Sequence, residues 1–230
     1  MTTNPAPVQE EKLLPLGYEI FVGVLSILSI LNLFLGWIWT DPDMSGVLNI
    51  MNGIFSVVFL GDFTYRILTT HDKSGYFFRR FGWADLLASL PFQQTKILRV
   101  FRLFRVYRLM RNVGPKKILN TLTKDRAGSA LYVLLIMGFL VMEFGALAIL
   151  KAEKANPDAN IQTASDAVWY VLVTISTVGY GDRYPTTGLG RIYGGIIILV
   201  GVGIFGTFTG FLANFFLSPG KKEEESDSPA

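Results

Sequence analysis

The sequence predicts an all-α membrane protein with six transmembrane helices, and three observations carry this prediction. Half of the 230 residues are hydrophobic and only 17 % are charged, whereas charged residues make up about a quarter of a soluble domain. The mean hydropathy is +0.40. The apolar residues also come in long blocks, and a helix needs about 20 apolar residues to cross the hydrocarbon core of a bilayer.

Six apolar blocks are assigned as spans. Four are long enough to cross by themselves: residues 17–39, 47–69, 128–150 and 191–217. Residues 81–92 would extend only about 18 Å as a helix, so they span only if residues 76–80 join them. Residues 95–112 are apolar except for a regular basic series, and residues 167–177 are apolar but too short to cross.

The basic residues between these blocks predict their orientation. The connection between the second and third blocks carries three basic residues and the segment after the fourth carries four, whereas the first connection has two acids and no base. Because cytoplasmic loops carry an excess of Lys and Arg, both termini are expected in the cytoplasm. Lys151, Lys154 and Arg183 count against this orientation but are outnumbered. The same distribution argues against a nucleic-acid partner, despite the net charge of +3.

Residues 177–182 read Thr-Val-Gly-Tyr-Gly-Asp and follow the short apolar block. A partly dehydrated cation needs oxygens in place of its water shell, and backbone carbonyls facing one axis supply them as rings from four chains. Gly179 and Gly181 can adopt positive φ at little steric cost. A chance match in an ordinary turn is the alternative, which the placement between two full spans disfavours.

The chain before this motif is expected to be a half-helix over residues 165–176, capped by Ser165 or Asp166. Irregular backbone at membrane depth is tolerated only where it is buried in protein or lines a cavity. A short helix followed by an irregular segment therefore predicts a re-entrant loop rather than a span.

A second motif consists of five arginines at every third position: Arg99, Arg102, Arg105, Arg108 and Arg111. Charges inside a bilayer are costly and usually functional, and moving one charge through 100 mV is worth about 2.3 kcal/mol. The series therefore predicts gating charges. A basic amphipathic helix on an anionic surface is the alternative, but Asp62 and Asp85 inside the preceding blocks offer partners within the membrane.

These motifs together resemble the voltage-gated potassium channel family in its six-span, prokaryotic form. The helix, Thr-Val-Gly-Tyr-Gly-Asp loop and helix of residues 129–216 resemble its pore, and the arginine series with Phe59, Asp62 and Asp85 resembles its sensor. The resemblance implies five regions: a cytoplasmic N-terminus 1–16, a four-helix voltage-sensor domain 17–112, a linker helix 113–126, a pore domain 127–217 and a disordered cytoplasmic tail 218–230.

The resemblance also implies roles for individual residues. K⁺, as permeant ion rather than cofactor, would bind the filter carbonyls of Thr177, Val178, Gly179 and Tyr180, with Gly181 completing the filter. Filter support would come from Glu153, Trp169, Tyr170 and Asp182. The charge-transfer site would be Phe59, Asp62 and Asp85. The hinge and gate would use Gly201, Gly206, Thr209, Leu212, Ala213 and Phe216.

Competing interpretations stay open for several of these residues. Trp169 and Tyr170 also suit ordinary helix packing, Asp62 suits a local pair with Arg66 four residues on, and the glycines suit close helix contact. The last span lacks a Pro-x-Pro bend, which leaves the gate undecided, and Asn52 stands where the family often has an acid.

The expected function is voltage-gated, passive K⁺ conduction by a homotetramer, because one chain supplies a quarter of such a pore. The expected location is a prokaryotic plasma membrane, with anionic lipid at the cytoplasmic face and no enzyme activity. A potassium channel with little voltage dependence and a non-conducting voltage-sensing subunit are the alternatives. The inverted repeats of a coupled transporter and the nucleophile–base pairs of an enzyme are not visible in the sequence.

Overall fold

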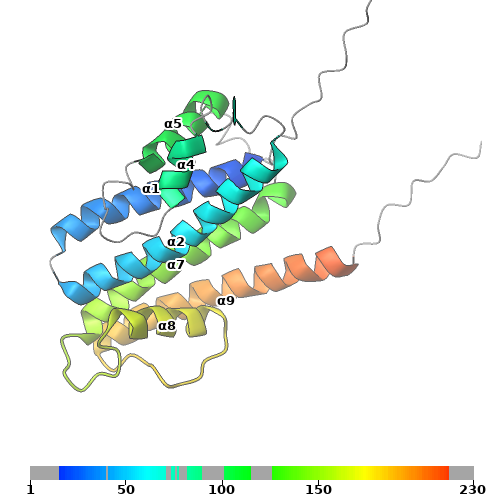
Figure 1. Ribbon diagram of the computed structural model, residues 1–230. Coiled ribbons are helices and arrows are strands. Elements are labelled where there is room, and N and C mark those ends of the chain that lie inside the picture. Colours follow the sequence, from blue (N-terminus) through cyan, green and yellow to red (C-terminus); the bar gives the residue numbers. More distant parts are fainter. Residues whose placement is uncertain are drawn as a thin grey trace, which may run out of the picture.

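The computed structural model describes residues 16–39, 41–70, 74–75, 77, 82–89, 101–114 and 126–217, and these residues form helices and connecting loops (Figure 1). The all-helical fold class is therefore confirmed. Nearly all of the expected N-terminus and linker helix, and the whole C-terminal tail, lie outside the described residues.

Helices α1 (Leu16–Ile38) and α2 (Pro42–Thr69) pack together as an antiparallel pair (Figure 1). The apolar block 47–69 lies within α2, which begins five residues before it. The Asp41 carboxylate caps the helix by accepting from the backbone N–H of Asp43 at 2.9 Å, and Pro42 occupies the first turn, where its missing N–H costs nothing. The connection between the two helices is correspondingly short.

Helices α4 (Gly82–Ser89) and α5 (Arg102–Val113) lie on the side of α1 and α2 that is remote from α8 and α9 (Figure 1). α4 contacts α2, α5 contacts α1, and Trp83 packs edge-on against Phe101 with ring centroids 5.6 Å apart. α5 ends where Gly114 takes a φ of 76°. Residues 90–100, which would complete the expected third and fourth spans, lie outside the described part of the chain.

Helices α7 (Arg126–Glu153), α8 (Ala164–Ile175) and α9 (Gly188–Leu217) form the second half of the molecule. The short α8 contacts α7, α9 and α2. The expected cap at Ser165 or Asp166 is wrong, because Thr163 caps α8. Thr163 Oγ1 accepts from the Asp166 N–H at 3.2 Å, and the Asp166 carboxylate accepts from the Thr163 N–H at 3.1 Å. This reciprocal pair is a capping box.

Among the described residues, four helices are long and apolar enough to cross a membrane: α1, α2, Ala130–Glu153 within α7, and α9. The buried core lies where α1, α2, α7 and α8 meet, and fully buried Leu25, Phe55 and Ile149 are part of it. α9 is the least covered of the four candidate spans.

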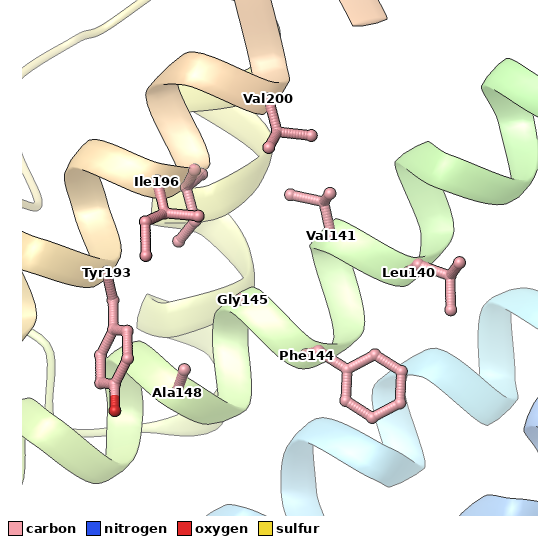
Figure 2. Close-up of a pocket in the computed structure, with 9 residues that line it drawn as sticks. Leu140, Val141, Phe144, Gly145, Ala148, Tyr193, Ile196 and Val200 are labelled. Carbon is pink, nitrogen blue, oxygen red and sulfur yellow. The ribbon is translucent and has the colours of Figure 1, made fainter.

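Between α7 and α9 lies an apolar groove of about 390 Å³ (Figure 2). Its lining comes from both helices and includes Leu140, Val141, Phe144, Tyr193, Ile196 and Val200. Beside it the helices approach closely, since a Cβ at Gly145 would lie 3.2 Å from the Ile197 side chain. Such a lining suits contact with lipid tails or other helices rather than water.

Candidate functional site

The residues from Thr177 to Gly181 leave the end of α8 with an alternating backbone. Thr177, Gly179 and Gly181 have φ values of 60°, 60° and 77°, while Val178 and Tyr180 between them have negative φ. The positive φ expected at the two glycines is confirmed. Thr177 was missed, because a β-branched residue rarely adopts this conformation, and such strained residues cluster at functional sites.

The amide side of this segment is tied to the last turns of α8. The backbone N–H of Thr177 donates to Thr174 at 3.1 Å, and those of Val178 and Gly179 donate to the Val173 carbonyl at 3.2 and 3.3 Å. Residues 177–182 are all exposed in the single chain. The segment is thus anchored through its backbone N–H groups, and its other side is exposed in the single chain.

Two of the expected support residues contact each other beside this segment. Trp169 Nε1 donates to the Asp182 carboxylate at 2.8 Å, and the Trp169 ring stacks on Tyr180 at 5.8 Å between centroids and 5° between planes. Tyr170 lies elsewhere: it is buried in the core, and a Cβ at Gly194 would lie 2.7 Å from its hydroxyl. The packing interpretation therefore suits Tyr170 better than Trp169.

Glu153, at the end of α7, holds the loop that leads into α9. Its buried carboxylate accepts four hydrogen bonds, two at each oxygen. Oε2 accepts from the backbone N–H of Thr186 at 2.8 Å and from the Thr186 hydroxyl at 2.6 Å. Oε1 accepts from the backbone N–H of Thr187 at 3.0 Å and from the Thr187 hydroxyl at 2.7 Å. Gly190 leaves room for it, since a Cβ there would collide with the carboxylate. No sequence spacing signals the threonines, which lie 33 and 34 positions away.

In the region expected to sense voltage, Arg102 is buried between α5 and α2. Its guanidinium donates to Asn52 Oδ1 at 3.3 Å and to Ser56 Oγ at 3.0 Å, and its Cζ lies 4.9 Å from the Phe59 ring centroid. Phe59 itself is fully buried. The partners of this arginine include Asn52, the residue at which the chain departs from the acid common in the family.

Asp62 lies one turn after Phe59 on α2 and is also buried. Its carboxylate accepts from Arg66 Nε at 2.8 Å and from the Tyr18 hydroxyl at 2.9 Å, and Arg66 also pairs with Glu19 at 2.8 Å. The local Asp62–Arg66 pair weighed from the sequence is therefore present. Tyr18 and Glu19 were missed, because they come from another helix.

The other residues expected in the sensor are placed less completely. Asp85 is buried on α4, and Arg111 is exposed in the last turn of α5. Arg105 and Arg108 lie on α5 with side chains outside the described part, and Arg99 lies outside it altogether. The assignment of these residues as gating charges stays a prediction.

Of the expected hinge and gate residues, Gly201 is buried and the others are exposed on α9. A Cβ at Gly201 would lie 2.8 Å from Cα of Ile175, the last residue of α8. The close-packing interpretation therefore applies to Gly201. The exposed members are Gly206, Thr209, Leu212, Ala213 and Phe216.

An ion pair joins the α1–α2 connection to the end of α7. Lys154 Nζ contacts carboxylate oxygens of Asp41 and Asp43, each at 2.8 Å. The hydrogen bond from Lys154 lowers the pKa of Asp41, and the hydrogen bonds to the two carboxylates raise the pKa of Lys154. From the sequence alone, Lys154 was only an exception to the expected excess of basic residues in cytoplasmic loops. Its two partners could not be predicted, because they lie more than a hundred residues away.

We expect Lys154→Met to lower the melting temperature at neutral pH and low salt. The depressed pKa of Asp41 makes its contribution present above the pKa of the unfolded state and lost as pH falls through the folded one. The pair is only partly buried, so salt should screen it. Melting wild type and variant at two salt concentrations checks this, and a difference that persists undiminished at high salt would contradict it.

Comparison with known proteins places the chain in a family. A family model described as ion transport protein matches residues 16–223, which is nearly the whole chain. The chain therefore belongs to the ion transport protein family. With its four helices of spanning length, it is a multi-pass membrane protein of a channel family rather than an enzyme.

Individual relatives narrow the class. A protein from Aeropyrum pernix named voltage-gated potassium channel is 36 % identical over 77 residues, which are 34 % of this chain and 26 % of the relative. Human potassium voltage-gated channel subfamily KQT member 4 is 34 % identical over 80 residues, which are 35 % of this chain and 11 % of the relative. The chain thus spans about a quarter of the first and about a tenth of the second, and the resemblance to voltage-gated potassium channels is confirmed.

Proposed function

We propose that this chain is one subunit of a homotetrameric, voltage-gated, potassium-selective channel. The alternating φ of residues 177–181 is the observation that carries the proposal. Residues whose φ alternates in sign can turn successive carbonyl oxygens to the same side of the chain. Four copies around an axis would supply rings of oxygens that replace the hydration shell of K⁺.

The exposed surface of α9 supports assembly with other copies. Large apolar side chains line this helix without cover from the described part of the chain, among them Leu199, Val202, Phe215 and Phe216. An apolar surface of this extent marks a protein or membrane contact. Neighbouring subunits would cover one side of α9 and leave the expected gate residues facing the pore.

The direction of the helices supports the six-span topology. The ring pairs Tyr18–Tyr132 and Phe21–Phe139 occur in the same order along α1 and α7, so the two helices run in parallel. α2 returns to the side on which α1 starts, and α7 begins there. The intervening chain must therefore cross an even number of times, and two crossings are the sequence prediction. Both termini would then be cytoplasmic, next to anionic lipid.

Burial of Arg102 supports voltage sensing. Its guanidinium lies against an amide, a hydroxyl and an aromatic ring within the helix bundle, where the membrane field would act on it. Three such charges per subunit would contribute about 7 kcal/mol per 100 mV. The proposed location is the plasma membrane of a prokaryote, with K⁺ as permeant ion and no cofactor.

Reconstitution of the purified protein into planar bilayers with opposed K⁺ and Na⁺ gradients tests the proposal. The expected result is a reversal potential near that of K⁺ and opening that depends steeply on voltage. Potassium current without voltage dependence would overturn the sensor assignment alone. An absence of current from a verified tetramer at both polarities would overturn the channel assignment and favour a non-conducting subunit.

We expect Asn52→Asp to move the midpoint of the gating-charge movement to more negative voltage. A carboxylate would strengthen the contact that holds Arg102 on the outer side of Phe59. The guanidinium is already charged, so the change adds the attraction of an opposite charge, which is about 1 kcal/mol at 4 Å even in the dielectric of water, and three charges convert 1 kcal/mol to about 15 mV. Gating-current recordings check the shift, Asn52→Leu should move the midpoint the other way, and an unchanged midpoint in both variants would contradict the prediction.

A further inference from the structure

One buried acid has no place in the proposed pore or sensor. Glu143 lies in the middle of α7 with a fully buried side chain, and neither carboxylate oxygen has a hydrogen-bond partner within the described part of the chain. A buried, isolated carboxylate is too costly to keep in its charged form. Its environment therefore has to supply a partner or leave the group neutral.

The direction of this side chain follows from its neighbours on α7. Phe139 lies four residues before Glu143 and so shares its face of the helix. The Phe139 ring contacts Phe21 of α1 at 6.2 Å and Phe55 of α2 at 5.6 Å between centroids. Glu143 consequently points into the junction between α7 and the α1–α2 pair, not toward α9 or the filter.

Asn32 of α1 lies opposite. The Asn32 carboxamide and the Glu143 carboxyl are both buried without a hydrogen bond within the described part of the chain, on two helices that pack together. An acid and an amide are complementary when the acid carries its proton. The acid hydroxyl can donate to the amide oxygen, and the amide nitrogen can donate to the acid carbonyl.

Charged groups on the packed helices do not offer a competing partner. α7 packs against α1, α2, α8 and α9, and the described ionisable groups there are engaged elsewhere or exposed. Glu19 and Asp62 pair with Arg66, Asp62 accepts from Tyr18, Asp43 pairs with Lys154, and Asp166 pairs with Arg183. Tyr65, Arg191 and Tyr193 are exposed, and a Cβ at Gly194 would lie 2.7 Å from the Tyr170 hydroxyl.

Asn32 also continues a polar row toward the sensor arginine. Ser29, one turn before it on α1, donates to Asn52 Oδ1 at 2.7 Å, and the same oxygen accepts from Arg102. All four side chains are buried. A row of polar groups in an apolar interior thus runs from Arg102 through Asn52 and Ser29 to the side of α1 that meets α7.

We propose that Glu143 is held protonated and pairs with Asn32 as an acid–amide clasp that fastens the sensor helices to the pore helix α7. The clasp gives α1 a directional, polar attachment to the pore in addition to apolar packing. Displacement of Arg102 would reach it through Asn52 and Ser29. Its coupling role rests on the proposed channel function, whereas its protonation and pairing do not.

Infrared spectroscopy of the full-length protein in lipid membranes at neutral pH tests the pairing. We expect the carbonyl stretching band of a protonated carboxylic acid in the wild type, its loss in Glu143→Gln, and a frequency shift in Asn32→Leu. Absence of the acid band from the wild type, or an identical band in Asn32→Leu, would overturn the clasp. This measurement needs no conduction, so its failure is separate from failure of the channel proposal.

Gating measurements test the coupling role. Glu143→Gln keeps a neutral group with a donating side and a carbonyl, and should leave the midpoints of charge movement and conductance together. Glu143→Leu removes both and should separate the two midpoints. Wild-type gating in Glu143→Leu would overturn the coupling role even if the infrared result stands. If the wild type itself does not conduct, the channel proposal fails instead.

Discussion

Gly179→Ala is expected to abolish potassium selectivity or to eliminate current. Gly179 has a φ of 60°, a conformation that costs a residue with a Cβ roughly 1–2 kcal/mol. The change would occur once in every subunit, so the four copies in one ring of the filter would carry about 4–8 kcal/mol of strain. Relief by rotation of the peptide would turn a carbonyl away from the axis. We expect at least a tenfold fall in the K⁺/Na⁺ permeability ratio, which bi-ionic reversal potentials measure.

Gly188→Ala is the matched control for this substitution. Like Gly179, Gly188 has no atom of its own chain within 4 Å of an added Cβ, but it lies at the start of α9 and has no positive φ. Alanine there should preserve selectivity and current. Equal effects of the two substitutions, or wild-type selectivity in Gly179→Ala, would show that the alternating backbone is not the conduction path.

Long apolar blocks were sufficient to predict the helices but not where they begin. The starts of α2 and α8 both lie in polar stretches, where several side chains could cap a helix. Asp41 caps α2 because Pro42 suits the first turn of that helix. Thr163 caps α8 because the Asp166 side chain, three residues later, accepts a hydrogen bond from the Thr163 backbone in return. Capping depends on which conformation the preceding residue adopts, and composition does not encode that choice.

In the candidate site, contacts between residues close in sequence could be predicted, whereas contacts between distant residues could not. The Asp62–Arg66 pair follows from a spacing of four on a helix, and positive φ at Gly179 and Gly181 follows from residue type. The contact of Arg102 with Asn52 joins residues 50 positions apart, on helices whose relative rotation the sequence does not specify. Side chains paired across helices are therefore the part that only the packed structure supplies.

Glu153→Gln is expected to destabilise the loop that leads into α9. The Glu153 carboxylate faces four donors, two at each oxygen. Glutamine replaces one oxygen with an amino group, which then faces a backbone N–H of Thr186 or Thr187. A threonine hydroxyl can rotate and accept instead, but a backbone N–H cannot. A buried donor without a partner costs about 1–3 kcal/mol, so we expect a melting temperature several degrees lower and faster loss of current during sustained opening.

A graded pair of variants at Thr186 separates this clamp from general packing. Thr186→Ser keeps both the hydroxyl and the amide that contact Glu153, and should behave nearly as wild type. Thr186→Val keeps the shape but removes one of the four donors, and should fall between wild type and Glu153→Gln. Thermal melting of the purified assembly and current decay should rank the variants in the same order. If Thr186→Ser is as damaging as Glu153→Gln, the methyl group and its packing hold the loop, because the hydrogen bonds to Glu153 survive in that variant.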